Sequence, residues 1–224
     1  MKTPWIEEGE NNIYILSKDF DFLQDTWNAI SAYALSVDST FSAQACPMTT
    51  VGNSDYNRRG FKYYADISSL LPAAVRNIYG SATKFMPRNC HGAALTASGI
   101  TPQLSYLKDT CLEVIFNVSM TKTSLNNLQS GDWIYLKDFP HGTEFAGATG
   151  GHSFIYIGDD LCLSMNGYWE NCGDYYSPKL KLSRTQDVLN FYGFPKEALI
   201  TSTEDQKNPW ESLIDVYRKI SMAL

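Results

Sequence analysis

The sequence predicts an α+β fold, in which helices pack on one side of an antiparallel sheet. Two observations support this prediction. Apolar residues recur at helical spacing in the first half, and the second half contains short β-prone segments separated by turn residues. With 44% hydrophobic and 19% charged residues, the chain can bury a substantial core, and no repeat or linker divides it. We therefore expect a single domain over residues 1–224.

The N-terminal part combines an extended segment with one long helix. Residues 12–16 are β-prone and precede residues that can cap a helix. Over residues 20–35, apolar side chains recur at mixed three- and four-residue spacings, which predicts an amphipathic helix that joins the core. Residues 36–66 are polar and rich in Ser, Thr, Asn and Gly. We expect an irregular or lightly structured insertion there, which could overhang a functional site.

Two further helices are expected before the chain midpoint. The first covers residues 67–79, with Pro72 in its first turn and Gly80 after its end. A loop over residues 81–88 then leads to a second helix, residues 90–98. This second helix begins with a cysteine, Cys90.

The second half predicts the sheet. Four β-prone segments are separated by turn residues: 112–117, 133–136, 152–158 and 161–167. The last two are expected to pair as a β-hairpin. Asp159 and Asp160 form the turn of the hairpin. Two short helices and a capped C-terminal helix over about 210–222 complete a helical extension, residues 185–224.

Charge and cysteine content exclude several classes of function. The net charge of −6 and the pI near 5.0 argue against binding to nucleic acid or to an anionic membrane surface. The N-terminus lacks the pattern of a Sec signal, and no segment is apolar enough to span a bilayer. Five scattered cysteines predict neither a disulfide framework nor a zinc site, and we expect no metal or cofactor.

Cys90 is the candidate nucleophile. A thiol at the start of a helix meets unpaired backbone N–H groups and the positive end of the helix dipole, and both favour the thiolate. A buried structural cysteine is the alternative interpretation. A nearby base favours catalysis, because a free thiol with a pKa of about 8.5 is mostly protonated at neutral pH.

Three histidines are the possible bases. His91 follows Cys90 on the same helix and points about 100° away from it, which makes it a poor partner. His141 lies in a surface loop. His152 begins an otherwise apolar strand and is the best candidate, although it could also be a hydrogen-bonded histidine at a strand edge.

A third group should hold the imidazole of His152. Side chains alternate along the hairpin, so Asn166 or Ser164 shares the sheet face of His152 if the turn contains an odd number of residues. Asn166 is the stronger choice because its amide oxygen is a good acceptor for a ring N–H.

Three motifs resemble the NlpC/P60 superfamily of papain-like cysteine peptidases. They are Asn89-Cys90-His91-Gly92, Gly131-Asp132-Trp133-Ile134-Tyr135-Leu136 and Gly151-His152-Ser153-Phe154-Ile155-Tyr156-Ile157-Gly158. The resemblance implies a catalytic core over about 79–167, with a nucleophile-bearing helix on an antiparallel sheet and extra helices at both ends.

The resemblance also implies an activity and the residues that perform it. Cys90 would be the nucleophile, His152 the base, and the backbone N–H of Cys90 part of an oxyanion hole. The orienting position falls near Ser164, with Asn166 as its substitute. Tyr79, Asn89 and His91 are candidates for substrate binding, and His91 stands where the family usually has serine.

Such enzymes cleave amide bonds in peptidoglycan peptides. Without an export signal or cell-wall-binding repeat, the chain is similar to antibacterial effectors that a type VI system delivers into a rival's periplasm. An immunity protein in the producing cell would then be a partner. Two alternatives stay open: a glutamine deamidase or transglutaminase-like toxin that acts on proteins, and a non-catalytic binding module with the same fold.

Overall fold

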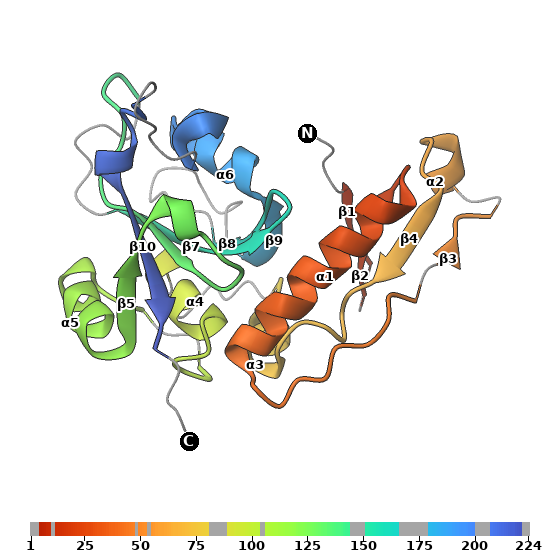
Figure 1. The fold of residues 1–224 in the computed structure, drawn as a ribbon, viewed down its shortest axis with the longest axis horizontal. Coiled ribbons are helices and arrows are strands. Elements are labelled where there is room, and N and C mark those ends of the chain that lie inside the picture. The colour runs from red at the N-terminus through yellow and green to blue at the C-terminus, as the bar shows by residue number, and fades with distance from the viewer. Residues whose placement is uncertain are drawn as a thin grey trace, which may run out of the picture.

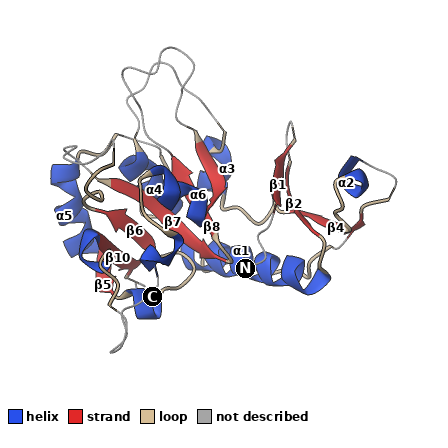
Figure 2. Cartoon of the chain, turned by 90° about the horizontal axis from the view of Figure 1, so that it is seen from above, coloured by secondary structure: helices blue, strands red, loops and turns tan. Residues whose placement is uncertain are grey.

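The computed structural model of the protein describes residues 5–9, 12–47, 49–52, 55–80, 89–103, 106–143, 151–165, 179–199 and 207–220. Two antiparallel sheets form in this part of the chain, and helices pack against them (Figures 1 and 2), which confirms the α+β class. The first sheet has the order β1 (Trp5–Glu8), β2 (Ile13–Ser17), β4 (Tyr63–Asp66), β3 (Thr49–Thr50). The second has the order β5 (Met120–Thr123), β10 (Ile214–Lys219), β6 (Trp133–Leu136), β7 (His152–Gly158), β8 (Leu161–Met165), β9 (Leu180–Arg184).

The helices in the described part of the chain are α1 (Phe20–Val37), α2 (Asp55–Arg58), α3 (Ala73–Ile78), α4 (Cys90–Ala97), α5 (Asp109–Ser119) and α6 (Thr185–Phe191). Short 3₁₀ turns cover Leu125–Asn127, Lys196–Leu199 and Glu211–Leu213. No helix in the described ranges is long and apolar enough to cross a membrane.

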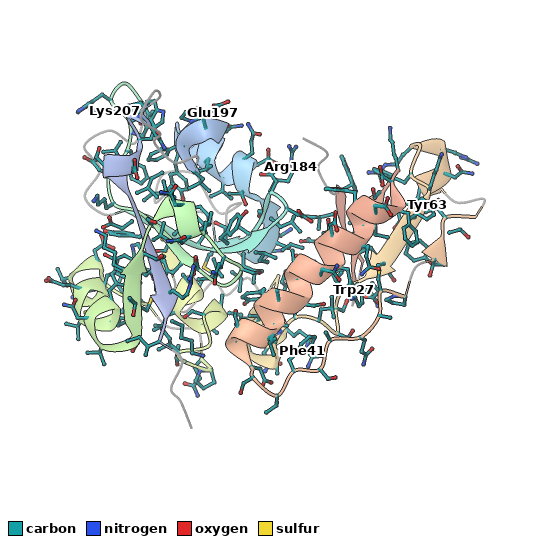
Figure 3. All side chains as sticks on the ribbon, in the orientation of Figure 1. Trp27, Phe41, Tyr63, Arg184, Glu197 and Lys207 are labelled. Atoms are coloured by element: carbon teal, nitrogen blue, oxygen red, sulfur yellow. The ribbon has the colours of Figure 1, made fainter. Side chains whose placement is uncertain are left out.

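Helix α1 joins the two sheets. Asp19 caps it by accepting a hydrogen bond from the backbone N–H of Phe22. Its buried side chains contact β2, β4 and β7, and Figure 1 shows the helix running between the sheets. Trp27, labelled in Figure 3, donates its indole N–H to the carbonyl oxygen of Gln44 at 2.9 Å. The predicted helix over 20–35 is confirmed.

The segment over 36–66 is more ordered than predicted. Strand β4 pairs antiparallel with β2, and the short β3 pairs with β4. Figures 1 and 2 show β3, β4 and α2 on the side of α1 that faces away from the six-stranded sheet. These elements therefore do not cover Cys90 in α4. The tyrosines of the segment were the missed signal, because aromatic residues favour strands.

Two predicted elements have the wrong type. Residues 112–117 belong to α5, not to a strand: Leu112 and Phe116 lie four residues apart and face the core, while Glu113 is exposed. The β-propensity of Val, Ile and Phe concealed this helical spacing. The predicted C-terminal helix over 210–222 is instead β10, in which Ile214 and Val216 alternate into the core.

Strand β10 completes the large sheet. It lies between β5 and β6, with Val216 opposite both Thr123 and Ile134. In the described part of the C-terminal extension, the helical segments are α6 and the 3₁₀ turns at Lys196–Leu199 and Glu211–Leu213, and the strand β10 belongs to the six-stranded sheet. The strands β1, β5 and β9 were not predicted.

The helix predicted over 67–79 is shorter in the structure. It covers Ala73–Ile78, with Pro72 at the N-cap position. A proline disfavours helical backbone at the preceding residue, so the helix begins only after Pro72.

The predicted hairpin forms between β7 and β8. Asp159 and Asp160 both have positive φ, 47° and 61°, as a type I′ turn requires. The register opposes Phe154 to Ser164, so Ser164 shares the sheet face of Phe154 and His152. One face of the sheet packs on α1 and α4, and the other packs on α6.

Candidate active site

Cys90 is the first residue of α4, as predicted. Asn89 is the N-cap: its side-chain Oδ1 accepts hydrogen bonds from the backbone N–H groups of Gly92 at 3.0 Å and Leu107 at 3.2 Å. Its Nδ2 donates to the carbonyl oxygen of Leu107 at 2.6 Å. Asn89 thus caps α4 and holds the loop before α5. These contacts give no support to the substrate-binding role expected from the sequence.

The thiol of Cys90 lies at the beginning of β7. Its Sγ is 4.0 Å from the carbonyl oxygen of Gly151, the residue before His152, and the side chain is 9% exposed. Every residue of α4 is buried, so the helix fixes its first residue firmly.

The surroundings of Cys90 stabilise its charged form. Burial alone raises the pKa of this thiol, but the charge of the nearby His152 lowers the pKa more, and His91 adds to this effect. The result is a pKa of about 5 for Cys90, so the thiolate predominates at neutral pH.

His152 is 1% exposed, and its two ring nitrogens have different surroundings. Nε2 lies 3.0 Å from Oγ of Ser164. Nδ1 is buried and has no hydrogen-bond partner among the described residues. When Nε2–H donates to Ser164, the lone pair on Nδ1 is free to accept the thiol proton.

Ser164, one of the two predicted candidates for the orienting group, is therefore in hydrogen-bond contact with His152. The other, Asn166, lies outside the described residues. The segments that lead into Cys90 and His152, residues 81–88 and 144–150, also lie outside them.

Tyr192 is a residue of the candidate site that the sequence did not indicate. It follows α6, is 4% exposed, and stacks on the ring of His152 with centroids 4.2 Å apart. Phe139 stacks on Tyr192 in turn, with centroids 5.3 Å apart. No local pattern links residue 192 to residue 152, so only the tertiary fold could identify this contact.

His91 is buried, and both of its ring nitrogens contact groups other than the thiol of Cys90. It is 2% exposed; its Nδ1 lies 2.8 Å from Oγ of Ser153, and its Nε2 lies 2.5 Å from Oδ1 of Asp109. Burial lowers the pKa of His91, but Asp109 and Cys90 raise it further, to about 9. The two Cα–Cβ bonds diverge, but His91 and Cys90 are adjacent residues, so the charge of one affects the pKa of the other. Because the ring is enclosed, His91 is not placed to bind substrate.

Tyr79 connects two distant strands. Its hydroxyl accepts a hydrogen bond from the backbone N–H of Leu182 in β9 at 3.0 Å and donates to Glu8 of β1 at 3.2 Å. Burial raises its pKa. The structure therefore places Tyr79 in an internal contact, and its predicted role in substrate binding has no support from this arrangement.

A cavity of about 280 Å³ opens beside the four-stranded sheet, and none of the candidate residues lines it: Tyr14, Thr50, Val51, Gly52, Tyr56 and Tyr64 form its walls. The chemistry of Cys90 and His152 lies elsewhere. Within the described ranges, no group of three or more His, Cys, Asp or Glu side chains is arranged to hold a metal ion.

Comparison of the chain with protein-family models, with curated proteins and with solved structures gave no match. What the protein does must therefore be argued from its own residues.

Proposed function

We propose that the protein is a cysteine hydrolase of amide bonds, with peptidoglycan peptides as its substrate class. The observation that carries this proposal is the pairing of Cys90, whose pKa is about 5, with His152, whose far ring nitrogen contacts Ser164. Nucleophilic amide hydrolysis requires an activated nucleophile and an oriented base. Here these are a thiolate at the start of a helix and an imidazole that a hydrogen bond holds in place.

The proposed reaction has two steps. The Cys90 thiolate attacks the amide carbonyl carbon, the backbone N–H of Cys90 stabilises the oxyanion, and the imidazolium of His152 protonates the departing amine. The acyl group is then joined to Sγ as a thioester. Neutral His152 next takes a proton from water, the hydroxide displaces Sγ, and the carboxylic acid leaves with the thiolate restored.

A papain-like fold of the NlpC/P60 type is consistent with the order of elements. The nucleophile helix α4 packs on β7 and β8, and β7 begins with the base His152. The Gly131-Asp132 motif leads into β6, the strand beside β7. This arrangement supports the assignment of cell-wall peptides as substrates, since the three motifs that resemble the family lie on adjacent elements.

An antibacterial effector role fits the same proposal. Delivery by a type VI system into a rival's periplasm would bring the enzyme to peptidoglycan, and an immunity protein would protect the producing cell. Co-expression of the genes adjacent to this one, with toxicity measured in the periplasm, would identify such a partner.

Digestion of purified peptidoglycan tests the substrate class. The unsubstituted protein should release new peptide fragments whose masses identify the bond cut, while Cys90→Ala and His152→Ala should release none. If Cys90→Ala releases the same fragments in equal yield, Cys90 is not the nucleophile. An intact cell wall together with deamidation of a glutamine-containing protein would replace this substrate class with the protein-directed alternative.

A further inference from the structure

We propose that His91 is a positioning residue of this site: a buried cation, held between Asp109 and Ser153, that stabilises the Cys90 thiolate alongside His152. The inference rests on the proposed function and adds a second imidazole to it. His91 lies next to the nucleophile in sequence and inside the protein, where a charged ring needs partners on both nitrogens.

Both nitrogens of His91 have such partners. Asp109, in the first turn of α5, places a carboxylate oxygen 2.5 Å from Nε2. Ser153 Oγ, 2.8 Å from Nδ1, also accepts the indole N–H of Trp133 at 2.8 Å. A hydroxyl oxygen can accept two hydrogen bonds, so Ser153 satisfies both Trp133 and a protonated His91. The ring can therefore carry its charge without an unsatisfied donor.

The other groups around His91 are compatible with a cation. Asp109 and Tyr135 contact the ring of His91, and Cys90 and His152 complete the titratable groups of the site. The other titratable or charged groups on elements that pack on α4 are the exposed Arg76 of α3, Tyr156 and Cys162 on the opposite face of the sheet, and Tyr33 of α1, which donates to Ala97 at the far end of α4. Tyr135 meets His91 edge to face, with centroids 5.8 Å apart; burial raises its pKa, the nearby charges of Asp109 and Cys90 raise it further, and the phenol stays neutral.

A second cation has a consequence for catalysis. In a site with one imidazole, that imidazole is neutral at the thioester stage, because it has given its proton to the departing amine. Here His91, the residue next to Cys90, keeps its proton between Asp109 and Ser153, so a cation is still present at that stage. A stabilised thiolate is also a better leaving group when water breaks the thioester.

The test measures the pH midpoint of Cys90 alkylation by iodoacetamide, followed by peptide mass spectrometry. His91→Gln should raise the midpoint by about one pH unit or more, which is about tenfold less thiolate at acidic pH. Asp109→Asn keeps His91 in place and should shift the midpoint in the same direction, since the carboxylate that holds the proton is gone. Because Asp109 is partly exposed, we expect Asp109→Asn to fold. This variant therefore tests the inference even if His91→Gln does not fold.

Glu113→Gln is the matched control, because it removes one exposed carboxylate from the same helix, α5. Its midpoint should equal that of the unsubstituted protein. His91→Gln should also shift the midpoint in the His152→Ala background. If His91→Gln and Asp109→Asn fold and leave the midpoint unchanged, the inference is wrong while the proposed function stands. If unsubstituted Cys90 titrates like a free thiol, at about pH 8.5, the proposed function itself fails.

Discussion

The phenol ring of Tyr192 lies 4.2 Å from the imidazole of His152, centroid to centroid, with the two planes inclined by 26°. Tyr192 follows α6, which packs on β8 and β9 and belongs to the C-terminal part of the chain. The segment after the motif-bearing core therefore contributes to the site by limiting how the ring of His152 can turn.

Two substitutions of Tyr192 distinguish the effect of its stacked ring on activity from the effect of its hydroxyl. Tyr192→Leu should lower kcat/KM by about 10- to 100-fold, because a base displaced by a fraction of an ångström transfers protons poorly. Tyr192→Phe keeps the ring and should retain most of the activity. Steady-state kinetics on released muropeptides, with circular dichroism to verify folding, measures both. Equal losses in the two variants would show that the hydroxyl, and not the stacked ring, is what matters.

Ser164 is expected to orient His152 through Nε2. Ser164→Ala removes the only hydrogen-bond partner seen for that nitrogen in the described part of the chain, and we expect kcat to fall about 10-fold with little change in KM. Ser164→Thr keeps the hydroxyl and is the control. A larger effect on KM than on kcat would argue that Ser164 contacts substrate instead.

Asn89 should matter for stability more than for substrate affinity. Asn89→Ala removes the α4 cap and two hydrogen bonds to Leu107, so the free energy of unfolding should fall by at least about 1 kcal/mol. Asn89→Asp keeps the cap acceptor and should lose less. Urea denaturation measures the difference. A rise in KM with unchanged stability would restore the substrate-binding role.

Asp132 connects the turn before β6 to the last strand. Its buried carboxylate, 1% exposed, pairs with Arg218 at 2.7 Å and 2.8 Å and accepts the backbone N–H of Gln129. We expect Asp132→Asn to cost about 2 kcal/mol, less than the roughly 3–5 kcal/mol of fully buried pairs because Arg218 is partly solvated. Lys122→Gln is the control: it removes an exposed lysine that pairs with Asp215 in the same sheet, and it should change stability far less. If Asp132→Asn and Lys122→Gln have similar midpoints of urea unfolding, this expectation is wrong.

The reactivity of Cys90 should depend on pH with a defined sign. Its pKa of about 5 lies below that of a free thiol, so the thiolate is present above about pH 5 and is lost as the pH falls through that value. Iodoacetamide should label Cys90 at pH 6 nearly as fast as at pH 8. Burial raises the pKa of Cys46 to about 11 and also raises that of Cys162, so both should stay unlabelled. Labelling of Cys90 only above about pH 8 would contradict a paired thiolate.

The sequence predicted the elements whose periodicity is strong and local. The helix at Cys90, the hairpin around Asp159 and the position of His152 at the start of a strand all follow from caps, turn residues and alternation near each residue. The register of the hairpin also selected Ser164 as one of two candidates for the orienting group.

The predictions that failed depended on contacts distant in sequence. Val216 becomes a strand residue because it fits between β5 and β6, and Phe116 becomes helical because Trp133 and Tyr217 pack against it. The contacts of His91 with Asp109 and of Tyr192 with His152 also join residues that no spacing along the chain connects. Propensity alone could not decide these cases.

The central claim, that Cys90 forms a thioester with the acyl part of a cell-wall peptide, is tested most directly by mass spectrometry of the acid-quenched reaction. We expect a transient mass increase equal to the acyl fragment, located on the Cys90 peptide, decaying as product accumulates and absent from Cys90→Ala. Product formation with no adduct on Cys90, at an equal rate in Cys90→Ala, would contradict the account.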